Sequence, residues 1–193
     1  MSIPAPSNIA PQTVIVAQKA WEVIGRTALA AGRAETGGLL VGRRVYAGEK
    51  SLLVVVEASG PGEKADRQLF TYAPEVDALQ HALNEACQRY YARGLKVDYI
   101  GEWHKHPARM NYLSGGDVKE GCSILDDPGY NLEYGEILLP IVTVGGRKTK
   151  NPEVLLNIYY LSRTCRQPQP IEWVVWEDSL SDRLLEQGKQ ICT

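Results

Sequence analysis

Helix-like and strand-like periodicities alternate along this chain, and this interleaving restricts its fold more than any other feature. Apolar residues recur at helical spacing from Val16 to Leu29 and again from Pro74 to Tyr91. Short apolar runs typical of strands lie before, between and after these two segments. A chain that alternates the two must pack its helices on the faces of a shared sheet. We therefore predict an α/β protein with a central mixed β-sheet flanked by helices.

Seven strand-like segments supply the predicted sheet, and two shorter helices complete the order. Ser114 is a good N-cap for a helix at 117–125, and the last helix spans about 179–189. The Gln-Pro-Gln-Pro segment at 167–170 reads as a linker. We expect one domain at 1–162 and a C-terminal strand–helix extension at 163–193. The predicted strands are 13–16, 37–42, 51–57, 97–106, 135–144, 153–161 and 171–177.

Composition narrows the classes of partner. Lys and Arg total 21 against 23 Asp and Glu, so the net charge of -2 disfavours a general nucleic-acid binder. No apolar stretch approaches the ~20 residues that cross a bilayer, and the first twelve residues lack the parts of a secretory signal. Because the four cysteines are too widely spaced for a metal clip, we read them as reduced thiols. We expect a cytoplasmic protein without membrane or nucleic-acid partners.

The sequence feature that says most about a functional site is an H-x-H pair near the end of the 97–106 strand. Side chains of a strand alternate faces, so His104 and His106 point the same way and can share one metal ion. Asp117, on the first turn of the next helix, can return over the strand end as a third ligand. Two imidazoles and one carboxylate leave a fourth position open, as in catalytic zinc sites. His81 is expected to be an ordinary helix residue.

Other interpretations of these residues stay open. Ser114 and Asp117 also fit a capping box, a purely structural pattern that is compatible with a ligand role. Glu102 shares the histidine face and could orient an imidazole or act as an alternative base, whereas Trp103 and Lys105 face the other way. Cys122 could be a nucleophile, but its apolar helix favours a small buried residue.

Taken together, these positions resemble the JAMM motif of the JAB/MPN metalloprotease family. The motif has an upstream glutamate, then H-x-H-P, then S-x-x-D, which stand here as Glu35, 104–107 and 114–117. The resemblance is strongest to the prokaryotic JAB branch and extends over about 13–161 in the order of elements. It implies a JAB/MPN-type fold, with the remaining C-terminal residues outside the match.

The resemblance also implies roles for individual residues. His104, His106 and Asp117 would hold one Zn²⁺, and Glu35 would position and deprotonate a water molecule. Ser114 would donate a hydrogen bond to the oxyanion of the tetrahedral intermediate. This is consistent with general metal chemistry, because zinc lowers the pKa of bound water toward about 7 and a nearby carboxylate can accept the proton.

The implied activity is that of a deubiquitinase-like metallo(iso)peptidase. Such an enzyme hydrolyses the peptide or isopeptide bond after the C-terminal glycine of a ubiquitin-like protein. The prokaryotic resemblance points to processing or deconjugation in a bacterial ubiquitin-like antiviral pathway, with E1/E2-like proteins as further partners. We expect the substrate tail to lie along a strand edge between the loops 59–70 and 126–136. The alternatives are a peptidase that trims sulfur-carrier proteins and a non-catalytic MPN scaffold.

Overall fold

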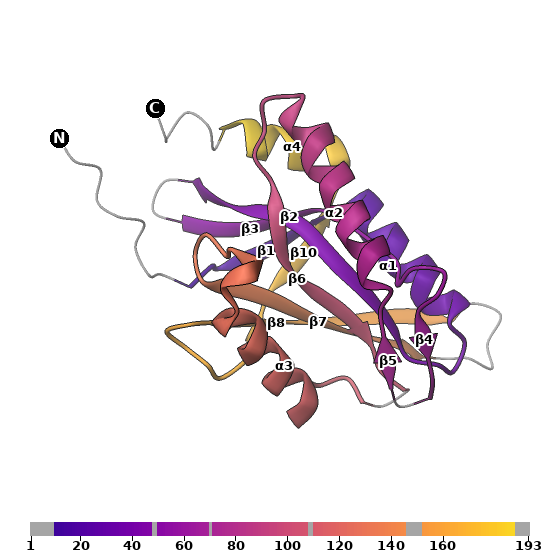
Figure 1. Ribbon diagram of the computed structural model, residues 1–193. Helices are drawn as coiled ribbons and strands as arrows, with labels where there is room; N and C mark the ends of the chain where they lie inside the picture. The colour runs from indigo at the N-terminus through magenta and orange to yellow at the C-terminus, as the bar shows by residue number, and fades with distance from the viewer. Residues whose placement is uncertain (1–9, 48–49, 70, 108–109, 146–151, 188–193) are drawn as a thin grey trace.

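A mixed eight-stranded sheet organises the residues that the computed structural model describes, which are 10–47, 50–69, 71–107, 110–145 and 152–187 (Figure 1). The strand order is β10-β1-β3-β2-β6-β7-β8-β9. β1 runs parallel to both its neighbours, β6 runs parallel to β7, and the other adjacent pairs are antiparallel. The strands are β1 (Thr13–Ala17), β2 (Thr36–Ala47), β3 (Lys50–Ala58), β6 (Asp98–Lys105), β7 (Glu136–Gly145), β8 (Glu153–Ser162), β9 (Gln169–Ile171) and β10 (Trp173–Trp176).

Four α-helices cover the two faces of this sheet within the described residues. One face carries α1 (Gln18–Ala30), whose buried alanines and Ile24 pack against Trp103 and the valines of β1 and β3. The other face carries α2 (Val76–Tyr91), α3 (Gly115–Asp126) and α4 (Asp178–Gln187), whose buried residues join a second core cluster. The predicted mixed sheet flanked by helices is therefore confirmed.

β6 lies inside the sheet and contains an irregularity that changes which residues share a face. Leu40 pairs with Gly101 and Val41 with Tyr99, so Ile100 is an extra residue in the ladder, as in a β-bulge. Gly101 has φ 145°, and a Cβ there would meet the Leu138 carbonyl oxygen at 2.0 Å. Because the bulge breaks the simple alternation, Tyr99 lies on the same face as Glu102 and His104.

Segments not foreseen as strands occur at two places. Gln169–Ile171 forms β9 and pairs with β8, so the predicted linker at 167–170 is wrong for its second half. Proline lacks an N–H but is tolerated on an edge strand, which is where Pro170 lies. In the predicted 59–70 loop and just beyond it, β4 (Asp66–Arg67) and β5 (Tyr72–Ala73) form a two-stranded sheet.

Six of the seven predicted strands are confirmed, with small shifts of their ends except in β2, which continues to Ala47. The predicted strand 171–177 is wrong as a single element, because Ile171 ends β9 on β8 whereas Trp173–Trp176 forms β10 on β1. The last helix begins one residue earlier than expected, at Asp178, and residues 188–189 of its predicted end lie outside the described part. A short 3-10 helix, η1 (Pro128–Tyr130), follows α3. Among the helices described, none combines the length and the apolar character needed to cross a membrane.

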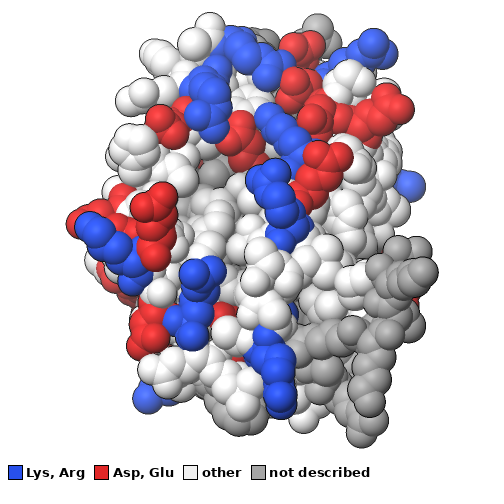
Figure 2. Space-filling view, turned by 90° about the vertical axis from the view of Figure 1, so that its right-hand side faces the viewer, with Lys and Arg blue, Asp and Glu red and all other residues white. Residues whose placement is uncertain are grey.

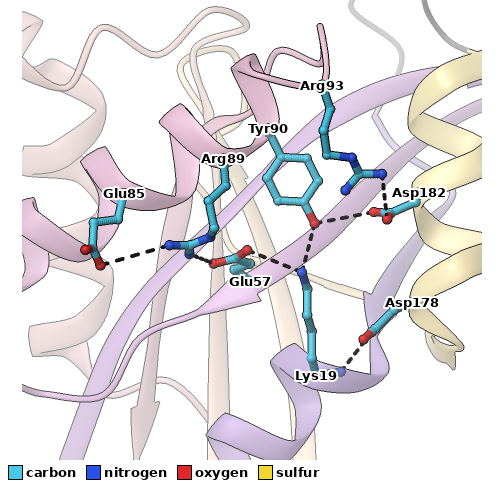
Figure 3. A network of polar contacts seen from close by, with 8 residues as sticks. All are labelled: Lys19, Glu57, Glu85, Arg89, Tyr90, Arg93, Asp178 and Asp182. Atoms are coloured by element: carbon cyan, nitrogen blue, oxygen red, sulfur yellow. Dashed lines mark hydrogen bonds and ion pairs between the residues drawn. The ribbon is translucent and has the colours of Figure 1, made fainter.

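A polar network, here called the Lys19 network, ties α1, β3, α2 and α4 together (Figure 3). The Lys19 ammonium donates to Glu57 at 3.3 Å and to the Tyr90 hydroxyl at 3.1 Å. The Lys19 backbone N–H donates to Asp178 at 3.0 Å, at the start of α4. The network therefore anchors the C-terminal helix to the body of the sheet. Its members are Lys19, Glu57, Glu85, Arg89, Tyr90, Arg93, Asp178 and Asp182.

Candidate functional site

The carboxyl end of β6 carries two histidines whose backbone is held from both sides. His104 is next to last in β6, and His106 follows the strand. Gly37 of β2 and Ile141 of β7 pair with His104. The His106 N–H donates to the Val142 carbonyl at 2.9 Å. The ring centroids lie 5.2 Å apart, so the predicted convergence of the two imidazoles is observed.

The first turn of α3 brings Asp117 onto both histidines. Asp117 Oδ1 lies 3.3 Å from His104 Nδ1, and Oδ2 lies 3.3 Å from His106 Nε2. The Ser114 hydroxyl accepts from the Asp117 N–H at 3.2 Å, and the Asp117 carboxylate accepts from the Ser114 N–H at 2.6 Å. This reciprocal pair is the predicted capping box, and it fixes the carboxylate in place.

Ser114 serves this cap without using its own hydroxyl proton. A serine hydroxyl that accepts one hydrogen bond still has its O–H to donate. The structure places Ser114 directly before the helix turn that carries Asp117. Its donation to an oxyanion stays a prediction.

Glu35 reaches the cluster from the segment between α1 and β2. Its backbone N–H donates to the Gln68 carbonyl at 2.7 Å, and the residue is only 7% exposed. Its Oε2 lies 3.7 Å from His104 Nε2. Gly37 permits the backbone of β2 to lie close to that of β6, because a Cβ at Gly37 would meet the Trp103 carbonyl oxygen at 2.5 Å. A carboxylate remote in sequence thus borders the histidine pair.

Contacts around His106 select one tautomer. His106 Nδ1 lies 3.1 Å from the Met110 carbonyl oxygen, which can only accept a hydrogen bond, so Nδ1 carries the proton. That leaves Nε2 directed at Asp117 and available as a ligand atom. In metal-binding histidines, the N–H of the second ring nitrogen typically donates a hydrogen bond to a carbonyl in this way.

Protonation within the cluster follows from the same contacts. Burial opposes ionisation of Asp117, but hydrogen bonds with His104, His106 and Ser114 outweigh it and hold the pKa of the carboxyl well below its usual range. Burial also opposes the charged form of His106, yet the hydrogen bond and charge of Asp117 raise the pKa of the imidazole. Asp117 is therefore an anion at neutral pH, whereas a metal must compete with a proton for His106.

The donor set fits a divalent transition metal. One ligand atom from each of His104, His106 and Asp117 lies within 4.8 Å of the others. His104 Nε2 is buried and has no hydrogen-bond partner in the described part of the chain, which is costly for a polar atom unless something else binds there. Two imidazoles and a carboxylate match zinc sites that keep one position open. The residues present could hold the ion that the sequence predicts.

A cleft of about 910 Å³ extends from the cluster across the face of the sheet that carries α2 and α3. Its floor includes β6, one wall is formed by α2, and the other by α3 and η1. Tyr72 of β5 lies at the cluster end, with its ring 5.3 Å from that of His104. Five carboxylate residues and no lysine or arginine are among the described lining residues: Asp98, Glu102, Asp117, Glu120 and Asp127.

Glu102 lines the cleft, and its carboxylate accepts a hydrogen bond from a tyrosine. Its Oε1 accepts from the Tyr99 hydroxyl at 3.2 Å, a contact that the bulge in β6 makes possible. Burial raises the pKa of the Glu102 carboxyl, and the charge of Glu120 adds to this effect. The prediction that Glu102 shares a face with His104 is confirmed, since the strand pairing is regular from Gly101 to Lys105 and the two residues are two apart.

Other sequence interpretations are settled by position. Cys122 packs against the hydrophobic core, in line with a small core residue. His81 is exposed on α2 and lies 3.7 Å from Glu85 one turn later. Tyr72 and Met110 were missed, because one contributes a ring and the other a carbonyl, and neither has a spacing signal.

Surface charge agrees with the near-neutral composition. Figure 2 shows blue and red side chains interspersed over one face of the molecule, without a broad region of a single sign. On this face, positive and negative side chains are mixed rather than gathered into one basic patch.

Comparisons with known proteins give one curated relative and a structural likeness. The chain is 28% identical over 134 residues to a protein named CD-NTase/cGAS isopeptidase from Enterobacter hormaechei subsp. hoffmannii (strain UCI 50), covering 69% of this chain and 67% of that protein. The solution structure of protein DSY2949 from Desulfitobacterium hafniense is similar with a TM-score of 0.57 at 16% identity, covering 85% of this chain and 93% of that one. No family model matches the chain.

Proposed function

We propose that this protein is a zinc-dependent metallo(iso)peptidase of the JAMM type. The observation that carries the proposal is the convergence of His104, His106 and Asp117 within 4.8 Å, with the Glu35 carboxylate 3.7 Å from His104 Nε2. The relative named as an isopeptidase supports the same class of bond. The substrate is the C-terminal glycine of a ubiquitin-like protein, joined to a peptide or to a lysine side chain.

The residues of the chain divide the work of hydrolysis. His104, His106 and Asp117 would hold the zinc ion, which would supply Lewis-acid polarisation and lower the pKa of water. The Glu35 carboxylate borders His104, which places it beside the candidate metal ligands. From there Glu35 accepts the proton from water and returns it to the leaving amine. Ser114 donates its hydroxyl proton to the oxyanion. Burial of Glu35 keeps this transfer away from bulk water.

The cleft provides a path for an extended substrate tail. Tyr72, Ala73 and Pro74 border it on the β5 side, and Gly129 and Tyr130 border it near η1. Residues 127 and 129–131 belong to the predicted 126–136 loop, whereas residues 72–74 lie just beyond the predicted 59–70 loop, so the cleft supports a tail placed between β5 and η1. Its carboxylates favour a tail that carries a cationic residue.

The biological setting follows from the relative, not from the site. Its name associates isopeptidase activity with CD-NTase/cGAS proteins. We infer a role in a bacterial antiviral conjugation pathway, in which this protein removes or trims a ubiquitin-like modifier in the cytoplasm and E1/E2-like proteins attach it.

The test combines substrate cleavage with metal content. Ubiquitin-like domains ending in glycine, fused through that glycine to a reporter or to a CD-NTase, are incubated with zinc-loaded protein, and mass spectrometry locates the cut. Glu35→Gln should keep one zinc and lose turnover by about 10²- to 10⁴-fold. Glu153→Gln, at an exposed end of β8, is the matched control and should cleave normally.

Two outcomes would count against the proposal. Normal turnover by Glu35→Gln would remove Glu35 as the base. Failure of the zinc-loaded wild type on every glycine-ended fusion, with zinc bound, would favour the non-catalytic scaffold.

A further inference from the structure

Lys105 is a fully buried lysine between the two histidines of the site. It has 0% exposure and ranks among the largest fully buried side chains. Strand alternation directs it away from the face of His104. Burial of an ammonium group costs several kcal/mol unless its charge and protons are satisfied. The hydrolytic chemistry described above does not use this charge.

One hydrogen bond of Lys105 ties it to the segment that carries Glu35. The Lys105 ammonium donates to the Ala34 carbonyl at 2.5 Å, and Ala34 directly precedes Glu35. Thr36, directly after Glu35, pairs with Lys105 across the β2–β6 ladder. The Glu35 N–H is held separately by the Gln68 carbonyl at 2.7 Å. The short segment that carries Glu35 is therefore tied to β6 on both sides of the glutamate.

We infer that Lys105 is a positioning residue for Glu35. This inference rests on the proposed function, in which Glu35 moves a proton. The Ala34 carbonyl takes a charge-assisted hydrogen bond, which is stronger than a neutral one and limits rotation of the adjoining peptide. A misplacement of about 1 Å can lower a rate by about 10²-fold, so a fixed peptide at this point matters for catalysis. The same strand thus supplies the histidines and the tether of the carboxylate.

The experiment is a double-mutant cycle between Lys105 and Glu35. Lys105→Met keeps the length of the side chain and removes its donors. In the zinc-loaded protein we expect kcat to fall by about 10- to 100-fold while KM changes by less than about two-fold. Zinc content should stay at the wild-type value. In the Glu35→Gln background, Lys105→Met should lower the residual rate by less than about two-fold, because the group that it positions is gone.

Matched variants separate positioning from stability. Lys19→Met removes another lysine that donates to polar partners, but far from the site in the Lys19 network, and its kcat should match the wild type. Lys105→Gln retains a donor group and should recover part of the lost kcat relative to Lys105→Met. Thermal unfolding of every variant shows how much of each loss is stability.

Several results would overturn the inference. These are an unchanged kcat in Lys105→Met, a loss that adds in full to that of Glu35→Gln, or a loss expressed only in KM. If neither Lys105→Met nor Lys105→Gln folds, the ammonium is structural and the positioning role is wrong. A wild type that cleaves while the losses are additive overturns only this inference, whereas a zinc-loaded wild type that cleaves nothing overturns the proposed function itself.

Discussion

Two charged clusters in this protein satisfy their polar groups in different ways. In the Lys19 network, Glu57 binds Lys19 and Arg89, and Asp182 binds Arg93 at 2.8 Å (Figure 3). Every cation there contacts a carboxylate, and the network joins helices to the sheet. In the candidate site, by contrast, His104 Nε2 is buried beside a cluster of ligand atoms and has no hydrogen-bond partner among the residues that the structure describes.

The difference teaches how to separate structural from functional charge. A matched network can stabilise the fold with no ligand, although partly exposed ion pairs each contribute only about 0.2–1 kcal/mol. A convergent cluster of ligand atoms that includes a buried nitrogen without a hydrogen-bond partner instead offers a position where a ligand can bind. Variants in the two regions should therefore separate activity from stability.

The largest effect is expected from Asp117→Asn, which keeps the size of the side chain and removes its charge. Asp117 contacts both histidines, so the variant should lose bound zinc and at least about 10³-fold in kcat/KM. Zinc is measured by mass spectrometry and cleavage with a glycine-ended fusion. Asp182→Asn in the Lys19 network is the control. Full zinc occupancy in Asp117→Asn would show that the ion binds elsewhere.

Removal of the metal should also affect stability through linkage. A ligand that binds only the folded state at 100 times its Kd stabilises it by about 2.7 kcal/mol. For a chain of this size, zinc in that excess should raise the Tm by about 5–10 °C relative to chelator-treated protein. The rise should vanish in Asp117→Asn and persist in Lys19→Met. A Tm that does not respond to zinc in the wild type would contradict the site.

A smaller effect is expected where charge faces the cleft. Glu102 accepts from Tyr99 and no lysine or arginine lines the described part of the cleft, so a substrate cation can interact with it. Glu102→Gln should raise KM by about five-fold for tails with a lysine or arginine, the equivalent of about 1 kcal/mol, and leave neutral tails unchanged. Steady-state kinetics on paired fusions decide this. Equal KM values for both tails in the wild type would dismiss the charge preference.

The smallest effect on activity is expected in the Lys19 network. Lys19→Met removes hydrogen bonds to Glu57 and Tyr90 and should lower the free energy of unfolding by about 1 kcal/mol. That corresponds to about 2–4 °C in Tm. Activity at 25 °C should not change. A loss of turnover without a loss of Tm would mean that the network couples to the site after all.

Much of the fold could be predicted because its signals are local. Helical spacing located α1 and α2, and Ser114 with Asp117 marked the start of α3 through contacts within a single turn. The bulge at Ile100 was not predicted, because it depends on the register of β2 against β6. β9 escaped for a related reason, since the pairing of its Pro170 with β8 outweighs a linker-like composition.

For the site, the sequence by itself determined the ligand types and the shared face of His104 and His106, because strand alternation is a property of the backbone. Resemblance to a family, rather than periodicity, pointed to Glu35. Only the tertiary structure decided that Glu35 lies against His104 and that Lys105 is buried beneath its segment. These contacts join residues that are far apart in sequence, and they form only when β2 pairs with β6 in one register. Local propensity carries no information about that pairing.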